Sequence, residues 1–276
     1  MQKTFHTPQP GTVRVELRSG TLDVHTDDTT ETLVEVTGDG ADDPGALTVE
    51  QCGDTVAVVA PPGRNGFFGS ERHLSVRVTA PHGTRLTTKL GSADLRVEGR
   101  LGGTTVQSGS GDVWIEEVTA DAGISTGSGD VEMETVGGEL QVRCGSGDVT
   151  LGAVHGPAQI STGSGEVVVT TAHRSVSVRS GSGDMRVREA LGDVQLSTAS
   201  GDLVVDAMRR GRLTAKNASG DISVGIPAGV PVWTDVSSTT GSIRSTLQSN
   251  GAPAEGQDYV ELRARTVSGD VHLEQI

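Results

Sequence analysis

The chain has 276 residues with 39 glycines, only 2% aromatic residues and 34% hydrophobic residues, a composition typical of short strands and tight turns. Its formal net charge of -14 at pH 7 disfavours DNA, RNA and anionic membranes as partners, because these bind to concentrated Lys and Arg. No stretch reaches the ~18 apolar residues of a membrane helix, and the N-terminal MQKTFHTPQP lacks the apolar run of a signal peptide, so we expect a soluble, cytoplasmic protein.

The first part of the chain, residues 1–85, contains short segments in which apolar and polar residues alternate. Examples are TVRVEL at 12–17, TVAVVA at 55–60 and LSVRVT at 74–79, separated by stretches rich in Gly, Pro and Asp. This alternation predicts strands, and SGTLDV at 19–24 resembles the repeat that follows. We therefore interpret residues 1–85 as irregular N-terminal rungs of the same body.

Residues 86–224 form a tandem repeat, read most clearly in GSGDVWI from Gly109. Its acidic position recurs every 18 residues, and finally after 19. That position is occupied by Asp94, Asp112, Asp130, Asp148, Glu166, Asp184, Asp202 and Asp221. A fixed period of this length indicates a repeat architecture.

Apolar residues fall in four columns of this repeat. After Asp148, for example, they are Val149 and Leu151, then Ala158 and Ile160. Each repeat therefore carries two strands whose alternate residues face one way. Because one repeat has too little apolar surface to fold alone, we predict an all-β, single-stranded parallel β-solenoid (β-helix) with ~18-residue rungs about 4.8 Å apart.

A further column holds only small residues, as a tight corner would require. It consists of Ser108, Thr126, Cys144, Thr162, Ser180 and Thr198. Both cysteines, Cys52 and Cys144, are expected to be small buried side chains, and no disulfide framework follows from two cysteines.

The period ends after residue 224, where GIPAGVPVW at 225–233 places prolines in the path of a strand. We interpret residues 225–276 as C-terminal rungs and a cap, with Trp233 and Tyr259 as cap residues, because the end of a solenoid must be covered. The whole chain, residues 1–276, is then predicted to be a single elongated domain.

The tandem GSGDV units, GVPVWTDV at 229–236 and the ending VELRARTVSGDVHLEQI at 260–276 resemble the bacterial DUF4097 β-strand-repeat family, and its actinobacterial branch in particular. The resemblance covers the whole chain and implies a single-chain β-helix. It implies no catalytic residues, because the family has no established reaction. Its members also carry the name adhesin, which is an inference from architecture.

The acidic column needs compensation, since carboxylates about 5 Å apart repel by about 1 kcal/mol per neighbouring pair in water. One interpretation is a calcium edge made by Asp112, Asp130, Asp148 and Asp184, because glycine-rich acidic nonapeptides build calcium-binding β-rolls. The alternative is a carboxylate that hydrogen-bonds the backbone N–H groups of its own GSG turn. The sequence favours the alternative, because GSGD occurs once in 18 residues rather than twice.

Outward-facing residues of the second strand alternate between Arg and Ser in successive rungs, beside several glutamines. The column reads Gln107, Ser125, Arg143, Ser161, Arg179 and Ser197. A flat array of Ser and Thr could bind ice or a glycan, but an arginine at every second rung favours a solvated face.

Three further places are candidates for contact with a partner. The residues concerned are Trp114, Phe67, Phe68, Arg209, Arg210 and Arg212. The outward Trp114 either stacks on Arg96 or meets a partner, and the phenylalanine pair either folds back onto the solenoid or docks on another molecule. The arginine turn is either solvated or contacts the acidic edge of another copy.

The sequence predicts no catalytic residues, no cofactor and no enzyme activity. His155 and His173 lie one rung apart, but the repeat places no Cys, Asp or Glu beside them to complete a metal site. We predict a non-catalytic structural or interaction scaffold that binds a protein partner or a second copy of itself. The alternatives, in order, are a surface adhesin or glycan-binding module, a calcium-binding β-roll and a carbohydrate-active enzyme.

Overall fold

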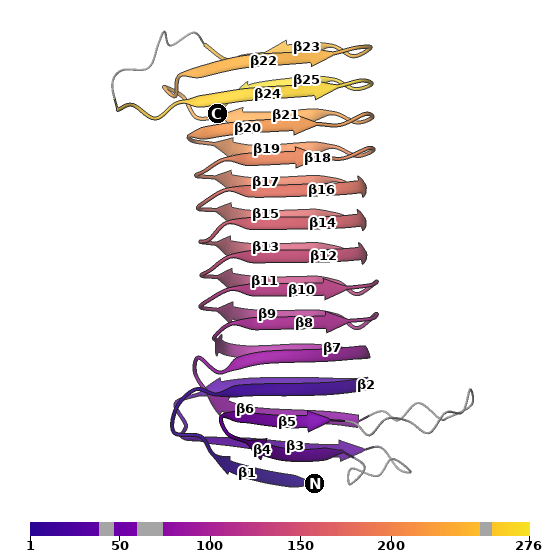
Figure 1. Ribbon diagram of the computed structural model, residues 1–276. Helices are drawn as coiled ribbons and strands as arrows, with labels where there is room; N and C mark the ends of the chain where they lie inside the picture. The colour runs from indigo at the N-terminus through magenta and orange to yellow at the C-terminus, as the bar shows by residue number, and fades with distance from the viewer. Residues whose placement is uncertain (39–46, 60–73, 249–255) are drawn as a thin grey trace, which may run out of the picture. The chain divides into compact units, whose positions relative to one another are not determined.

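The computed structural model describes residues 1–38, 47–59, 74–248 and 256–276. Every regular element in these residues is a β-strand, so they contain no helix long and apolar enough to span a membrane. Contacts group the chain into two compact units, Met1–Gly138 and Glu139–Ile276, whose strands are labelled in Figure 1. A single domain over residues 1–276 stays a prediction.

The strands of the first unit are β1 (Gln2–His6), β2 (Thr12–Asp27), β3 (Glu31–Gly38), β4 (Thr48–Cys52), β5 (Thr55–Val59), β6 (Leu74–Pro81), β7 (Arg85–Leu101), β8 (Thr104–Ser108), β9 (Val113–Val118), β10 (Ala122–Thr126) and β11 (Val131–Val136). Those of the second unit are β12 (Leu140–Ser146), β13 (Val149–Val154), β14 (Ala158–Ser164), β15 (Val167–Ala172), β16 (Val176–Ser182), β17 (Met185–Ala190), β18 (Val194–Ser197), β19 (Leu203–Met208), β20 (Gly211–Lys216), β21 (Ile222–Ile226), β22 (Val232–Ser238), β23 (Ile243–Ser245), β24 (Val260–Thr266) and β25 (Val271–Gln275).

In the second unit each rung consists of two strands, and successive rungs pair in parallel. β12, β14, β16, β18 and β20 form one sheet, while β13, β15, β17, β19 and β21 form the other. The register follows the repeat, since Leu140 aligns with Ala158 and Val149 with Val167. The predicted all-β parallel solenoid with 18-residue rungs is confirmed.

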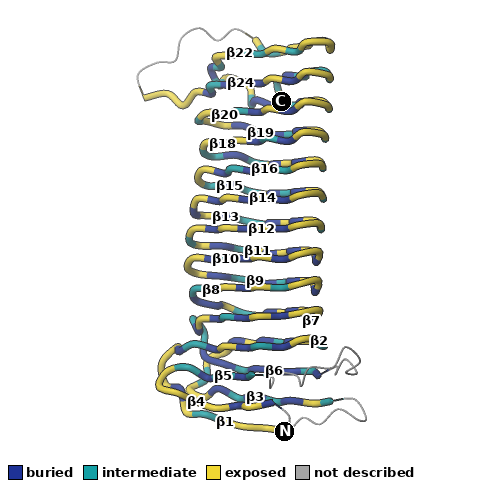
Figure 2. Tube along the Cα trace, turned by 45° about the vertical axis from the view of Figure 1, so that its right-hand side comes forward, coloured by how far each residue is buried: buried dark blue, intermediate teal, exposed yellow. Residues whose placement is uncertain are grey.

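The predicted apolar columns form the core between the two sheets. Buried residues alternate with more exposed ones along the rung strands β12 to β21, as the tube in Figure 2 shows. The buried column residues of three successive rungs include Val149, Leu151, Ala158, Ile160, Val167, Val169, Val176, Val178, Met185 and Val187. Each fully buried Val or Leu contributes about 1.5–3 kcal/mol, so every added rung extends the same apolar ladders.

The first unit contains parallel rungs that lie out of chain order. β2 pairs in parallel with β5 and β6 on one side and with β7 on the other, so an early strand lies between two later rungs. β3 runs antiparallel to β6, β1 to β3, and β4 to β5. Of the predicted irregular N-terminal rungs, β2, β5 and β6 are rungs, whereas β1, β3 and β4 are antiparallel additions.

The C-terminal rungs are also out of chain order. β24 and β25 pair with β20 and β21 on one side and with β22 and β23 on the other. The final strands of the chain therefore lie between two rungs that precede them in sequence.

The prediction that Trp233 and Tyr259 are cap residues is wrong. They are 53% and 50% exposed. In β22 it is Val232 that stacks on the buried Val260, so Trp233 points to the outer face beside Glu261.

The column of small residues lies at the corners, where its side chains bind the turn. Thr162 Oγ1 donates to Ser164 O at 2.8 Å, and Thr198 Oγ1 donates to Ser200 O at 2.9 Å. Cys144 occupies the same column and is buried, as expected. The same expectation is wrong for Cys52, which is exposed because it ends β4 at the hairpin with β5.

A large inward side chain and its outward neighbour should differ sharply in their effect on stability. Leu151 in β13 is 0% exposed, whereas Thr150 beside it is exposed. We expect Leu151→Ala to lower the free energy of unfolding by about 2–5 kcal/mol and Thr150→Ala to change it by less than about 0.5 kcal/mol. Urea unfolding of both variants measures this, and equal losses would contradict the inward and outward assignment of β13.

Candidate functional site

The acidic residue of the GSGD turn is fixed by a hydrogen bond to the next rung. In each pair, Oδ1 of the first residue accepts the backbone N–H of the second at 2.7 to 3.0 Å. The pairs are Asp94–Asp112, Asp112–Asp130, Asp148–Glu166, Asp184–Asp202, Asp202–Asp221 and Asp221–Asp270. The sequence predicted that each carboxylate accepts backbone N–H groups of its own turn. This prediction is wrong about the donor, which is the backbone N–H of the acidic residue on the next rung.

The four candidate calcium ligands are divided between the units. Asp112 and Asp130 lie in the first unit, and Asp148 and Asp184 lie in the second. Calcium takes six to eight oxygen ligands, yet Oδ1 of Asp112, Asp148 and Asp184 already accepts a backbone N–H. Among the described residues, no group of three or more His, Cys, Asp or Glu side chains is placed to hold a metal ion.

His155 and His173 stack face to face at one corner of the second unit. Their ring centroids lie 4.4 Å apart with an angle of 17° between the planes. Nitrogen lone pairs lie in the plane of each ring, so in two nearly parallel rings they do not converge on one ion. The pair therefore stabilises the corner by stacking.

Trp114 in β9 stacks on Arg96 in β7, one of the two alternatives left open by the sequence. The Arg96 guanidinium carbon lies 4.3 Å from the centre of the Trp114 ring. Arg96 Nε also donates to Glu98 Oε1 at 3.0 Å. This contact supplies Trp114 with a partner inside its own unit, and contact with another molecule stays a prediction.

The predicted basic turn is charge-compensated. Arg209 pairs with Glu189 at 2.7 Å, Arg210 with Asp258 at 4.0 Å and Arg212 with Glu261 at 2.9 Å. The hydrogen bond from Arg212 to Glu261 raises the pKa of the Arg212 guanidinium. These ion pairs reduce the free positive charge that the sequence offered to another copy.

The phenylalanine pair, Phe67 and Phe68, lies outside the described residues. Its contact with a partner stays a prediction.

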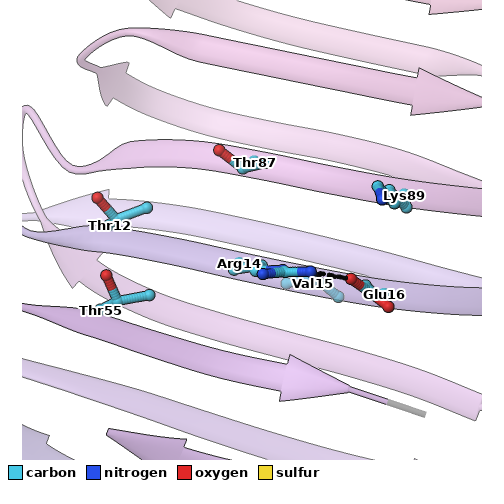
Figure 3. Close-up of a pocket in the computed structure, with 7 residues that line it drawn as sticks. All are labelled: Thr12, Arg14, Val15, Glu16, Thr55, Thr87 and Lys89. Carbon is cyan, nitrogen blue, oxygen red and sulfur yellow. Dashed lines mark hydrogen bonds and ion pairs between the residues drawn. The ribbon is translucent and has the colours of Figure 1, made fainter. Parts of the chain in front are cut away.

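A shallow depression of about 430 Å³ lies on the outer face of β5, β2 and β7 in the first unit, and Figure 3 shows its lining. Arg14 Nε donates to Glu16 Oε1 at 3.2 Å, and this hydrogen bond is the main reason that the pKa of Glu16 lies below its usual range. Lys89 aligns with Glu16 from β7. Arg14 and Glu16 are therefore paired with each other, and Lys89 leaves this depression with one positive charge in excess.

The outer face of β12, β14, β16, β18 and β20 in the second unit is different, and we name it the polar face. Its outward residues are Gln141, Arg143, Gln159, Ser161, Ser177, Arg179, Gln195, Ser197, Arg212, Thr214 and Lys216. A shallow depression of about 710 Å³ runs over it, and the carboxylate of Asp193 also lines this depression. The sequence pattern identified the row from Arg143 to Ser197 but missed Lys216, because the 19-residue repeat displaces it by one position.

The polar face meets exposed aromatic residues at its C-terminal side. β24 pairs with β20, and β22 pairs with β24, so the outward Trp233 belongs to the same sheet. The Arg263 guanidinium carbon lies 5.6 Å from the centre of the Trp233 ring. This face thus combines amides, hydroxyls, cations and a half-exposed indole.

A family model described as Toastrack DUF4097 matches residues 12–174 and 123–274. No curated protein matches the chain. A solved Parabacteroides distasonis protein named "putative adhesin" is similar at 13% identity over 100% of this chain and 96% of that chain, with a TM-score of 0.42. A Bacteroides fragilis protein of the same name has 12% identity, 100% and 96% coverage and a TM-score of 0.35. Another P. distasonis protein, named "putative lipid binding protein", has 10% identity, 100% and 96% coverage and a TM-score of 0.32. Identities and TM-scores this low carry no functional inference.

Loss of one corner carboxylate should cost about one hydrogen bond. We expect Asp184→Ala to lower the free energy of unfolding by about 0.5–1.5 kcal/mol, because the N–H of Asp202 loses its acceptor. Asp184→Asn keeps an Oδ1 acceptor and removes a charge from the column, so its stability should stay close to that of the parent. Urea unfolding compares the three proteins, and an Asp184→Ala protein as stable as the parent would refute a stabilising role of the ladder.

The hydrogen bond at the Asp270 corner should make the free energy of unfolding depend on pH. Asp270 Oδ1 accepts the Ser242 N–H at 2.8 Å, and this bond, followed by one from the Ser242 hydroxyl, lowers the carboxyl pKa below the usual 3.8. A lowered folded pKa gives stability that is present above the unfolded pKa and is lost as the pH falls through the folded pKa. The stability difference between the parent and Asp270→Asn should therefore be largest above pH 3.8 and shrink below it. A difference that stays constant across this range in urea unfolding at each pH would be inconsistent with the lowered pKa.

Proposed function

This chain belongs to the Toastrack DUF4097 family, and we propose that it is a non-catalytic interaction scaffold that presents rows of side chains on the outer faces of its rungs. The observation that carries the proposal is the polar face, where five neighbouring strands display exposed amide and cationic groups and mostly half-buried hydroxyl groups around one shallow depression. Parallel pairing in register sets these groups about 4.8 Å apart along each row. Rows of this regularity suit a ligand that is itself extended.

The use of the frequent reactive side chains supports a non-catalytic role. A general base must be free to take a proton from a substrate, whereas the corner carboxylates accept backbone N–H groups. The corner hydroxyls of Thr162 and Thr198 donate to turn carbonyls. The repeat therefore uses these groups to hold the rungs together.

A crosslinker placed on either side of one rung tests the proposal. Gln159 in β14 lies on the polar face, and Thr170 in β15 lies on the outer face of the opposite sheet, and both are exposed. With a photoreactive amino acid at each position in turn, we expect more covalent adducts in extracts of the native host from position 159 than from position 170. Electrophoresis of the purified protein measures the adduct fraction. Equal fractions at both positions, or no adduct at either, would refute docking through the polar face.

A further inference from the structure

One row of the polar face carries cations at every second rung. The parallel register aligns Arg143 with Ser161, Ser161 with Arg179, Arg179 with Ser197, and Ser197 with Lys216. With rungs about 4.8 Å apart, successive cations are separated by about 10 Å. Arg143, Arg179 and Lys216 are all exposed.

Six exposed arginines of the second unit form ion pairs, whereas these three cations, like Arg174, Arg188 and Arg244, form none within 4.0 Å among the described residues. Arg186 pairs with Asp206 at 2.9 Å, and Arg212 pairs with Glu261 at 2.9 Å. Within the part of the chain that the structure describes, none of the three cations takes part in an ion pair within 4.0 Å. Their positive charge is therefore available to a ligand, although the protein as a whole is strongly acidic.

Repulsion between like charges explains only part of this pattern. Cations on adjacent rungs lie about 5 Å apart and repel each other, which accounts for the serines between Arg143, Arg179 and Lys216. Beyond Lys216 the row continues with Arg265 of β24, whose charge is paired with Asp235 at 3.4 Å. An acidic residue at the intervening rungs would relieve the repulsion further and form ion pairs, yet those rungs carry Ser161 and Ser197. Hydroxyl groups between unpaired cations fit a ligand that alternates charged and neutral units.

The neighbouring row supplies polar groups without charge. It consists of Gln141, Gln159, Ser177, Gln195 and Thr214. Amide and hydroxyl side chains both donate and accept hydrogen bonds, as sugar hydroxyl groups do. Trp233, half exposed on the same sheet, adds an apolar ring face at the C-terminal side.

We propose that the polar face binds an acidic polysaccharide in which charged and neutral sugars alternate, with the polymer running across the strands along Arg143, Arg179 and Lys216. This inference rests on the proposed function and names its ligand class. Such polymers are found at cell surfaces, so the proposed ligand favours that location over the cytoplasmic one that the sequence predicts.

Other linear polyanions fit less well. A nucleic acid carries a charge on every nucleotide and is held by many Lys and Arg contacts, whereas this row offers three cations beside an acidic corner. In an extended acidic peptide, residues on one side recur about every 6.6 Å, which does not match a spacing of about 10 Å. A glycan with one charge per two sugars avoids both mismatches.

The test uses the full chain with hyaluronan oligosaccharides as the probe, because these alternate an acidic and a neutral sugar. The comparison ligands are polygalacturonate of equal length, neutral dextran, polyglutamate and single-stranded DNA. Calorimetric titration is expected to show hyaluronan oligosaccharides binding most tightly and losing affinity as salt rises. One triple variant replaces all three cations by serine, the residue already present at positions 161 and 197: Arg143→Ser, Arg179→Ser and Lys216→Ser. It should weaken hyaluronan binding roughly tenfold and reduce the dependence of the affinity on salt.

The matched control removes the same three charges elsewhere. Arg18, Arg85 and Arg188 are exposed and lie outside the polar face, so their triple serine variant should bind like the parent. Both variants should unfold at the same urea midpoint as the parent.

The inference is overturned if hyaluronan oligosaccharides do not bind, if both triple variants lose affinity equally, or if polygalacturonate, polyglutamate or DNA binds at least as tightly. If crosslinking in those cases still favours position 159 over position 170, the proposed scaffold function holds with another ligand. If that preference is also lost, both the scaffold function and the polysaccharide ligand are refuted.

Discussion

The contact on which the rungs depend is the in-register corner of the GSGD turn. One carboxylate oxygen accepts the N–H of the acidic residue on the next rung, as Asp184 does from Asp202. The glycine before the acid allows this stacking, because a Cβ on Gly201 would lie 2.3 Å from the carbonyl oxygen of Gly183, and its φ of +130° is one that side chains rarely adopt. Most rungs that make this contact use a glycine followed by an acidic residue, which explains why the most repeated stretch of the chain is structural. The bond also fixes carboxylates that would otherwise only repel each other, so the acidic column stabilises the stack on balance.

The same corner contact continues through rungs that are not consecutive in sequence. Asp221 accepts the N–H of Asp270, and Asp270 in turn accepts the N–H of Ser242, so the C-terminal strands are held on both sides by earlier segments. In the first unit β2 occupies a similar position between β6 and β7. A strand paired on both sides has no free edge to fray or to recruit another chain. In both units, therefore, a terminal segment of the chain is an inner rung, and an internal segment forms a rung beyond it.

Periodicity predicted the interior of the molecule because burial follows directly from it. The four apolar columns are buried, and the extra residue of the 19-residue repeat is absorbed at a turn, which leaves Leu213 and Ala215 buried at 0% and 1% exposure. Rung order at the two ends could not be predicted, since alternation tells which way a side chain faces but not which strand lies beside it. The same limit explains the wrong assignment of Trp233, whose outward direction depends on pairing with β24. For the candidate site, the pattern showed the alternation of Arg143, Ser161 and Arg179, but only the structure shows that their charges lack acidic partners nearby.

The buried columns and the corner hydrogen bonds stabilise the stack of rungs. Outward residues can therefore differ from rung to rung without disrupting it. Half of the exposed cations of the second unit are used in ion pairs, which bring little stability at an exposed surface but neutralise the face locally. The row through Arg143, Arg179 and Lys216 keeps its charge, although a single acidic residue at position 161 or 197 would have cancelled much of it. On a chain with a net charge of -14, an unpaired row of cations gives the second unit a place where negative charge is attracted. Because the cations lie in one row, a bound anionic polymer is aligned along that row, across the strands. The regular spacing of the rungs then selects ligands whose negative charges have a matching spacing.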